Sequence, residues 1–224
     1  MKLYSVDLSP YSSKIRMQLY AKGLGQIAIE RPATFMTPAW RETSPIGRLP
    51  VLELDDGAVI PESDVIAAYL EEVFPTPSLL GATPKESADV RVLAHLADAY
   101  LITSIFNLTG GQGRPAREGE LRDRFVAGVL RGFEALDKVI DGAGGYACLG
   151  RLTLADCALV PALFMIENVL PHSGADNPIP ASAKVSAYWA AIQSEPAAAR
   201  VLAEMRRGLQ ARLEAVLKAE AAGG

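Results

Sequence analysis

Cysteine and histidine are scarce in this chain. There are only two of each, namely Cys148, Cys157, His95 and His172. None of them has the spacing of a metal-ligand pair, and two cysteines cannot form a disulfide framework. The sequence therefore predicts no metal site and no disulfide-stabilised fold, and we interpret both cysteines as unreactive thiols.

The chain also lacks a clustered basic face and any apolar run that approaches the ~20 residues needed to span a bilayer. Its formal charge is −4 over 224 residues. Because phosphate binding needs concentrated lysine and arginine, nucleic acid is not expected as a partner. Asp7 and Pro10 interrupt the N-terminal segment, which excludes a signal peptide there. We expect a cytoplasmic protein that has no membrane contact.

Half of the residues are apolar, which is enough for a substantial core. The chain begins with apolar residues at positions 3, 4, 6 and 8, a pattern that fits a short strand ended by Pro10. Ser12 or Ser13 is predicted to cap the helix that follows. A helix N-terminus beside several hydroxyls favours a bound anion. The segment therefore predicts a strand, a polar turn and an anion site.

The turn at 9–12 reads Ser-Pro-Tyr-Ser. It looks like the Cys-Pro-Tyr-Cys turn of glutaredoxins with both sulfur atoms replaced by hydroxyls. That replacement removes disulfide chemistry and leaves donors for a thiolate that a ligand brings in. The ligand group predicted to bind at this turn is therefore a sulfur anion.

Two more segments continue this half of the chain. Residues 27–30 fit a second strand, reached by a parallel crossover, and residues 44–60 fit a hairpin that turns at an Asp-Gly pair. Pro50 begins one hairpin strand, where a missing N–H is tolerated. Glu62 and Ser63 then open a helix and suit a zwitterionic ligand, with the carboxylate for an ammonium and the hydroxyl for a carboxylate. A plain helix cap is the alternative interpretation.

Beyond Pro84 the sequence is helical and predicts an all-α bundle. The helical segments are expected at 85–108, 119–141, 153–170 and 181–218. Thr153 and Asp156 have the spacing of a capping box, so we interpret Asp156 as structural. His95 is expected in the core or an interface. Neither His95 nor His172 has a visible Ser/Asp companion, which argues against acyl transfer.

Taken together, these features resemble the cytosolic glutathione S-transferases. The likeness rests on the turn at 9–12, on Gly-Arg-Leu-Pro-Val-Leu at 47–52 and on Pro-Glu-Ser-Asp-Val-Ile-Ala-Ala-Tyr-Leu at 61–70, followed by the capping box. The resemblance implies an α/β thioredoxin-like, glutathione-binding domain at 1–80. It implies an all-α helical-bundle domain at 86–224 that contributes the pocket for an electrophile.

The resemblance also implies roles for single residues. Ser9 would donate a hydrogen bond to the glutathione sulfur, as in the serine-type classes, with Tyr11 and Ser12 as alternatives. Leu49, before a cis Pro50, would pair its backbone with the cysteinyl part of the tripeptide.

Further contacts follow from the same likeness. Glu62 and Ser63 would hold the γ-glutamyl end, and Arg48 would meet the glycyl carboxylate, with Arg41 as a weaker candidate. Asn107 matches a helical Asn-Leu pair that contacts glutathione in the zeta class. The candidate walls of the electrophile pocket are the aromatic residues Tyr11, Phe35, Tyr100 and Phe106.

The implied activity is that of a glutathione S-transferase acting on a small apolar electrophile, with peroxide reduction open to the same thiolate. Glutathione is the implied co-substrate, and a homodimer is the implied assembly. Two alternatives remain open, a glutathione-dependent isomerase or ether-cleaving enzyme and a non-catalytic binding protein of the same fold. The turn lacks the zeta Ser-Ser-Cys-Ser sequence, and the chemistry of omega and beta classes needs a cysteine that the turn does not contain.

Overall fold

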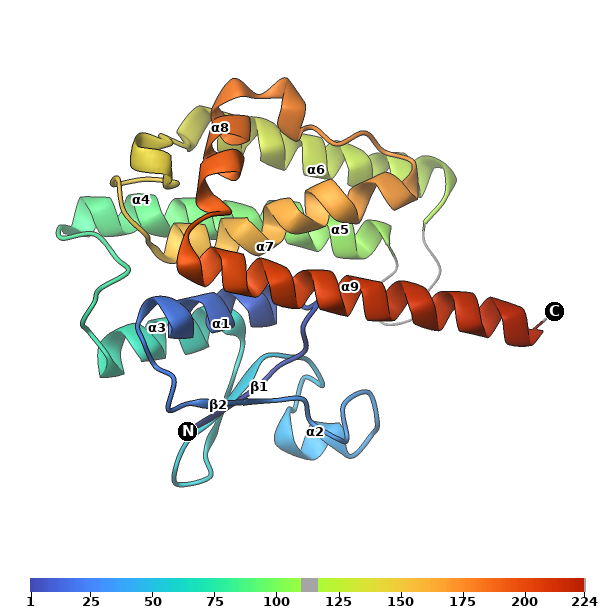
Figure 1. The fold of residues 1–224 in the computed structure, drawn as a ribbon, viewed down its shortest axis with the longest axis horizontal. Helices are drawn as coiled ribbons and strands as arrows, with labels where there is room; N and C mark the ends of the chain where they lie inside the picture. Colours follow the sequence, from blue (N-terminus) through green and yellow to red (C-terminus); the bar gives the residue numbers. More distant parts are fainter. Residues whose placement is uncertain (110–116, 224) are drawn as a thin grey trace.

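The computed structural model describes residues 1–109 and 117–223. A four-stranded sheet with the order β2-β1-β3-β4 lies at one end of the molecule, and helices cover it (Figure 1). The strands are β1 (Lys2–Tyr4), β2 (Ala28–Glu30), β3 (Val51–Glu53) and β4 (Val59–Pro61). β1 and β2 are parallel, while β1 and β3, and β3 and β4, are antiparallel. The expected crossover and hairpin are both confirmed.

Three helices accompany the sheet: α1 (Pro10–Ala21), α2 (Trp40–Thr43) and α3 (Ser63–Val73). The predicted cap of α1 at Ser12 or Ser13 is wrong. The cap is Ser9, whose Oγ accepts the N–H of Ser12 at 3.3 Å, and Pro10 occupies the first helical position. Proline suits that position because its missing N–H would be unpaired there in any case.

The second half is helical, as expected. Its α-helices are α4 (Pro84–His95), α5 (Thr103–Leu108), α6 (Gly119–Val139), α7 (Leu154–Asn168), α8 (Ala183–Ile192) and α9 (Pro196–Gly223). The π-helical turn η1 (Leu96–Ile102) joins α4 to α5, and three short 3-10 turns follow, η2 (Ala143–Gly145), η3 (Leu170–Ser173) and η4 (Ile179–Ala181). The sheet with its helices, followed by this bundle, confirms the predicted fold class.

The segment expected as one helix at 181–218 is two helices. Pro196 starts α9 after a break, and the Glu195 carboxylate accepts the N–H of Ala198 at 2.9 Å. A proline removes one helical hydrogen bond and clashes with the preceding turn, so it begins a new helix more readily than it continues an old one.

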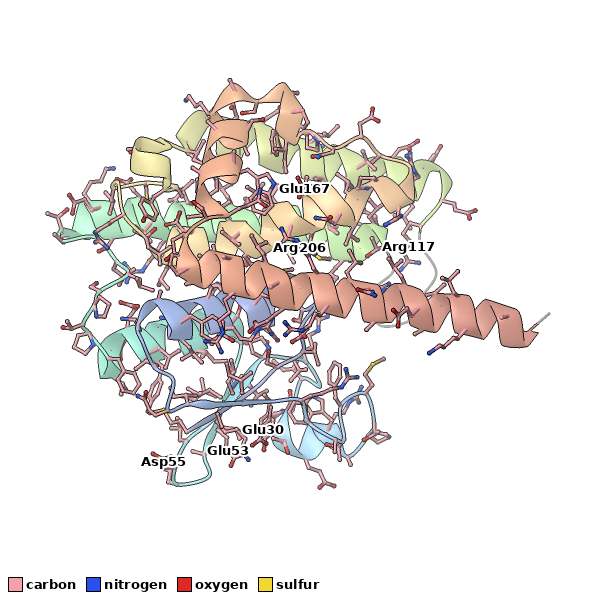
Figure 2. The ribbon with its side chains drawn as sticks, in the orientation of Figure 1. Glu30, Glu53, Asp55, Arg117, Glu167 and Arg206 are labelled. Atoms are coloured by element: carbon pink, nitrogen blue, oxygen red, sulfur yellow. The ribbon has the colours of Figure 1, made fainter. Side chains whose placement is uncertain are left out.

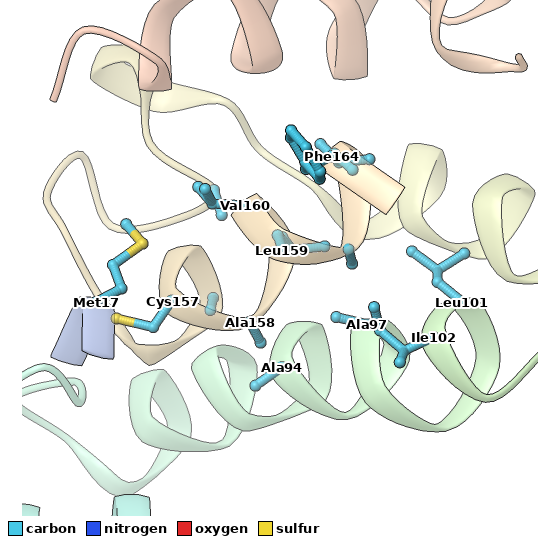
Figure 3. Packing of buried hydrophobic residues seen from close by; sticks show 14 of the residues in the cluster. Met17, Ala94, Ala97, Leu101, Ile102, Cys157, Ala158, Leu159, Val160 and Phe164 are labelled. Carbon is cyan, nitrogen blue, oxygen red and sulfur yellow. The ribbon is translucent and has the colours of Figure 1, made fainter. Parts of the chain in front are cut away.

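Helix α7 lies at the centre of the bundle. Its predicted capping box is confirmed, because Thr153 and Asp156 exchange hydrogen bonds at its N-terminus. Small side chains such as Ala94 and Ala158 let α4 and α7 approach closely, and Phe164 fills the space further along (Figure 3). The thiol of Cys157 is buried beside Met17 of α1, so α7 also supports the helix that begins at Ser9 (Figure 3).

Helix α9 crosses the molecule and packs on both α1 and α7 (Figure 1). Arg206 is exposed on α9, whereas Glu30, Glu53 and Asp55 lie at the opposite end, near the strands (Figure 2). The first loop of the chain lies against this last helix, where Arg207 of α9 donates to the Asp7 carboxylate at 3.3 Å.

One sequence expectation on apolar runs needs correction. The continuous helical run 84–109 contains an 18-residue window with a mean hydropathy of 1.3, so by its length and composition this run could cross a membrane. Within the same window 44% is buried inside the protein. The core helix of a globular protein has the same properties, because its apolar face packs against its neighbours.

Candidate functional site

A hollow of about 250 Å³ opens where the start of α1, the start of α3 and the turn η1 meet. Residues from both halves of the chain line it, including Asp98 and Thr103 of the helical half. Many of the residues that the sequence singled out are also there, namely Tyr11, Arg48, Leu49, Pro50, Glu62 and Ser63.

The segment before β3 forms one wall. The Leu49–Pro50 peptide bond is cis, and within residues 1–109 and 117–223 the Leu49 backbone makes no hydrogen bond. Ser44 fixes the neighbouring backbone, because its Oγ donates to the Arg48 carbonyl at 2.9 Å and accepts the Arg48 N–H at 3.2 Å. The Leu49 N–H and C=O are therefore held in place and open to an extended ligand.

The start of α3 forms the opposite wall. Glu62 has φ 70° and ψ 121°, a conformation that a residue with a side chain rarely adopts. Its side chain does not cap α3, so the donors of the first turn are left to other partners. Ser63 is buried at this helix end beside the hollow. The local strain and the free donors together favour an anionic group of a ligand here.

The three candidate hydroxyls of the first turn differ in their surroundings. Ser9 Oγ accepts the Ser12 N–H, and within the described residues its own hydrogen has no acceptor. Tyr11 lines the hollow, and its hydroxyl lies 3.4 Å from the Asp98 carbonyl and 3.3 Å from Thr103 Oγ1. Ser12 Oγ is fully buried without a hydrogen-bond partner. Burial raises the pKa of Tyr11, so its phenol stays protonated.

Arg16 holds the loop that precedes Ser9, a role that the sequence analysis missed. Its guanidinium donates to the carbonyls of Val6 and Asp7, each at 2.9 Å, and also to Ser5 Oγ. Its Nε donates to Glu204 of α9 at 2.7 Å. Arg16 is fully buried, so this set of bonds fixes the path of the chain into α1.

Lys14 is the second buried cation that the sequence analysis missed. Its ammonium pairs with Asp64 of α3 and with Asp98 of η1, the latter at 2.5 Å. Burial alone would lower the pKa of Lys14, but the two carboxylates outweigh it and raise this pKa. The available signal was weak: a lysine between two serines and an isoleucine at the start of a helix.

Comparison with known proteins now decides the family. Residues 3–78 match the family model described as the glutathione S-transferase N-terminal domain, and residues 119–191 match the C-terminal domain. Maleylacetoacetate isomerase from Pseudomonas aeruginosa is 33% identical over 177 residues, which cover 75% of this chain and 82% of that protein. The chain belongs to the glutathione S-transferase family.

Two further similarities accompany that match. A stringent starvation protein A homolog from Coxiella burnetii is 32% identical over 184 residues, covering 82% of each chain. The structure of a bacterial zeta-class glutathione S-transferase, maleyl pyruvate isomerase, superposes with a TM-score of 0.72 at 25% identity, over 90% of this chain and 96% of the other. Membership of this family supports glutathione as the co-substrate of the chain.

Within this glutathione S-transferase the remaining predicted residues are not part of the lining of the hollow. Ser9 and Ser12 are among them, although they lie on either side of Tyr11 in the chain, and Tyr11 does line it. Phe106 packs on the Tyr11 ring with 5.8 Å between the ring centres. Phe35 lines a second hollow of about 560 Å³ that shares Arg48 with the first. Tyr100 is 52% exposed, and Asn107 is exposed on α5. Phe106 therefore extends the apolar surface of Tyr11, whereas the ligand contacts predicted for Phe35, Tyr100 and Asn107 stay predictions.

His95 was expected in the core or an interface. The core placement is wrong, because His95 is exposed and lines the hollow, and the interface placement stays a prediction. His95 ends α4, where the start of η1 turns the helix toward α3. Besides His95, the charged lining consists of Arg48 and the carboxylates of Glu62, Asp64 and Asp98. Acidic groups therefore outnumber basic ones around the cavity of this glutathione S-transferase.

The possible metal ligands among the described residues are their His, Cys, Asp and Glu side chains. Within residues 1–109 and 117–223, no three His, Cys, Asp or Glu side chains gather as a metal would require. Cys148 and Cys157 are both buried. Burial raises the pKa of Cys148 to about 11 and that of Cys157 well above its ordinary value.

Proposed function

We propose that this chain is a glutathione transferase that activates the glutathione thiolate for attack on a small, uncharged electrophile. The observation that carries the proposal is the hollow itself, in which two helix N-termini and the unpaired Leu49 backbone face one another. An extended peptide with an anion at each end matches those groups. Glutathione is such a peptide.

The tripeptide has one orientation that satisfies the lining. The γ-glutamyl end goes to the start of α3, where Glu62 accepts its ammonium and the donors around Ser63 receive its carboxylate. The cysteinyl backbone pairs with Leu49. The glycyl carboxylate lies toward Arg48, the one arginine of the lining. This arrangement leaves the sulfur near the start of α1.

Ser9 is the proposed donor to the sulfur. Lowering a thiol pKa by about two units requires roughly 2.7 kcal/mol of preference for the thiolate. A hydrogen bond to a charged acceptor contributes about 1.5 to 3 kcal/mol, and the N-terminus of α1 about 0.3 to 1 kcal/mol more. Ser9 and the helix are together sufficient, so no general base is needed. The thiol proton passes to solvent, and the thiolate attacks the electrophilic carbon. The carbon–sulfur bond forms as a leaving group departs as an anion, or as the π bond of a conjugated acceptor opens and water protonates the resulting carbanion.

The charges around the hollow favour an uncharged second substrate. Arg48 is used by the glycyl end, and the Lys14 ammonium already pairs with Asp64 and Asp98, so within the described residues neither cation is left to bind a dianion. The Tyr11 and Phe106 rings offer an apolar surface instead.

Glutathione-dependent isomerisation is the second candidate. It is favoured by the identity of 33% to a maleylacetoacetate isomerase. In that reaction the thiolate would add to a conjugated double bond and leave again after rotation, so the same sulfur site would serve. A non-catalytic role is the third reading.

We further propose a cytoplasmic homodimer with the division at 1–80 and 86–224. Size-exclusion chromatography with light scattering tests the dimer.

Titration of glutathione across pH, followed by ultraviolet difference spectroscopy, tests the sulfur site. The expected result is a thiolate band well below the ordinary thiol pKa, which Ser9→Ala abolishes while glutathione still binds. Tyr11→Phe is the matched hydroxyl variant and is expected to keep the band. Retention of the band in Ser9→Ala would remove Ser9 from the mechanism, and absence of any binding would favour the non-catalytic reading.

Turnover of a chloronitrobenzene and of a cis-configured dienone acid then separates the two enzymatic candidates. Conjugation without isomerisation is expected, and isomerisation alone would establish the second candidate.

A further inference from the structure

Lys14 is an unusual residue for the interior of a protein. Its side chain is 2% exposed, although a buried ammonium loses most of its hydration. Such a group is tolerated only when carboxylates compensate it. Lys14 has two of them, Asp64 and Asp98, and both line the hollow.

The two carboxylates come from separate parts of the chain. Asp64 directly follows Glu62 and Ser63 in the first turn of α3, whereas Asp98 belongs to η1 in the helical half. The Asp98 backbone is itself fixed, because its carbonyl accepts Thr103 Oγ1 at 2.8 Å. Lys14 therefore links the start of α3 to a firmly held point on the other side of the hollow.

The two partners differ in how much they depend on Lys14. The Asp98 side chain is 12% exposed, and the Asp64 side chain is 65% exposed. Beyond the ion pair with Lys14, no hydrogen bond holds the Asp64 carboxylate within the residues that the structure describes. Without the lysine, Asp64 would be free to turn into solvent, and the ion pair that holds the chain two residues after the strained Glu62 would be lost.

We propose that Lys14 is a positioning residue for the γ-glutamyl end of glutathione, acting by holding the first turn of α3 against η1. The inference rests on the proposed function, since it assumes that the start of α3 binds the γ-glutamyl group. Lys14 touches neither the sulfur nor the electrophile in this arrangement. Its loss should therefore weaken recognition of one end of the tripeptide only.

The experiment compares glutathione with cysteinylglycine, which lacks the γ-glutamyl group. The quantity measured is the dissociation constant of cysteinylglycine divided by that of glutathione, from isothermal titration. Lys14→Met alone leaves Asp98 buried without a partner and is prone to unfold, so it is studied with Asp98→Asn, which removes that charge. Asp98→Asn by itself is the reference, because it keeps the Lys14–Asp64 pair.

Lys22→Met is the matched control. Lys22 caps the C-terminus of the same helix, is also buried, and pairs with Glu71 further along α3 at 2.9 Å. It does not line the hollow. The control therefore removes a buried lysine between the same two helices without touching the first turn of α3.

The expected result is that the ratio falls by about tenfold or more in the double variant relative to Asp98→Asn, the loss that corresponds to one charge-assisted hydrogen bond. Lys22→Met should keep the wild-type ratio even where it lowers the melting temperature. An unchanged ratio in the double variant would overturn the inference while glutathione still binds. If the wild-type chain bound neither thiol, the proposed function would fail first.

Discussion

Removal of the Glu204 carboxylate is the sharpest test of how the helical half supports the first turn. The Arg16 side chain is 2% exposed and that of Glu204 is 11% exposed, so their 2.7 Å ion pair is shielded from water. Tyr20 donates to the other carboxylate oxygen at 2.7 Å. Breaking a buried pair from one side costs about 3 to 5 kcal/mol, because the remaining charge stays buried.

That loss in the free energy of unfolding corresponds to a fall in the melting temperature. For a chain of this length 1 kcal/mol corresponds to roughly 2 to 4 °C, so Glu204→Ala should lower the melting temperature by about 6 to 20 °C. Differential scanning calorimetry measures it. The thiolate band of bound glutathione should also weaken, since Arg16 fixes the loop that leads to Ser9.

Glu214→Ala is the control for this prediction. Glu214 lies on the same helix and is exposed, and among the residues that the structure describes it accepts a hydrogen bond from Gln210 alone, at 3.0 Å. Its loss should change the melting temperature by less than about 2 °C, as expected for a surface residue. A fall of the same size in both variants, or none in Glu204→Ala, would refute the inferred role of the buried pair.

Three other outcomes follow from the structure. A Cβ at Gly208 would lie 2.7 Å from the backbone N of Leu8, so Gly208→Ala should lower both the melting temperature and the affinity for glutathione. Gly128→Ala is the control, because its Cβ would meet a serine hydroxyl that can rotate away, and it should keep the affinity. Burial raises the pKa of Asp156 to about 6, so the stability that this carboxyl contributes is greatest below pH ~4 and is lost as the pH rises through about 6. Urea unfolding should show a difference between wild type and Asp156→Asn that changes by about 3 kcal/mol across that window, and a constant difference would contradict the pKa. Cys148, with its pKa raised to about 11, should resist iodoacetamide at pH ~8 in the folded protein and react in urea, as mass spectrometry would detect.

The parts of the fold that the sequence predicted correctly have local causes. An Asp-Gly pair turns a hairpin, and the Thr153–Asp156 spacing caps a helix, wherever they occur in a chain. The same holds for much of the candidate site, because the stretches 47–52 and 61–70 each carry several of its residues in order. Their meeting in one hollow follows from β3 and β4 being neighbours.

The features that the sequence analysis missed depend on distant partners. Arg16 pairs with Glu204, which is 188 residues away, and no pattern in either segment identifies the other. The cap of α1 was misplaced because serines at 9, 12 and 13 all suit a cap, and only the path of the loop selects Ser9.

The aromatic residues illustrate a second limit. The hydrogen bonds of η1 run to the fifth residue along instead of the fourth, so η1 is wound more loosely than an α-helix and turns the faces of α5 relative to those of α4. Tyr100 within η1 and Asn107 on α5 are both exposed. A periodicity of 3.6 residues cannot anticipate that rotation.

The buried ion pairs of α1 have a consequence for protein engineering. Lys14 and Arg16 belong to the sheet-bearing half, yet Asp98 and Glu204, which neutralise them, belong to the helical half. A chimera that joins the first 80 residues to the bundle of another transferase would leave Arg16 without its carboxylate and Lys14 with only the largely exposed Asp64, unless both acids of the helical half came with them. Exchange of halves among such enzymes should therefore succeed only as a coordinated transplant of both charge pairs.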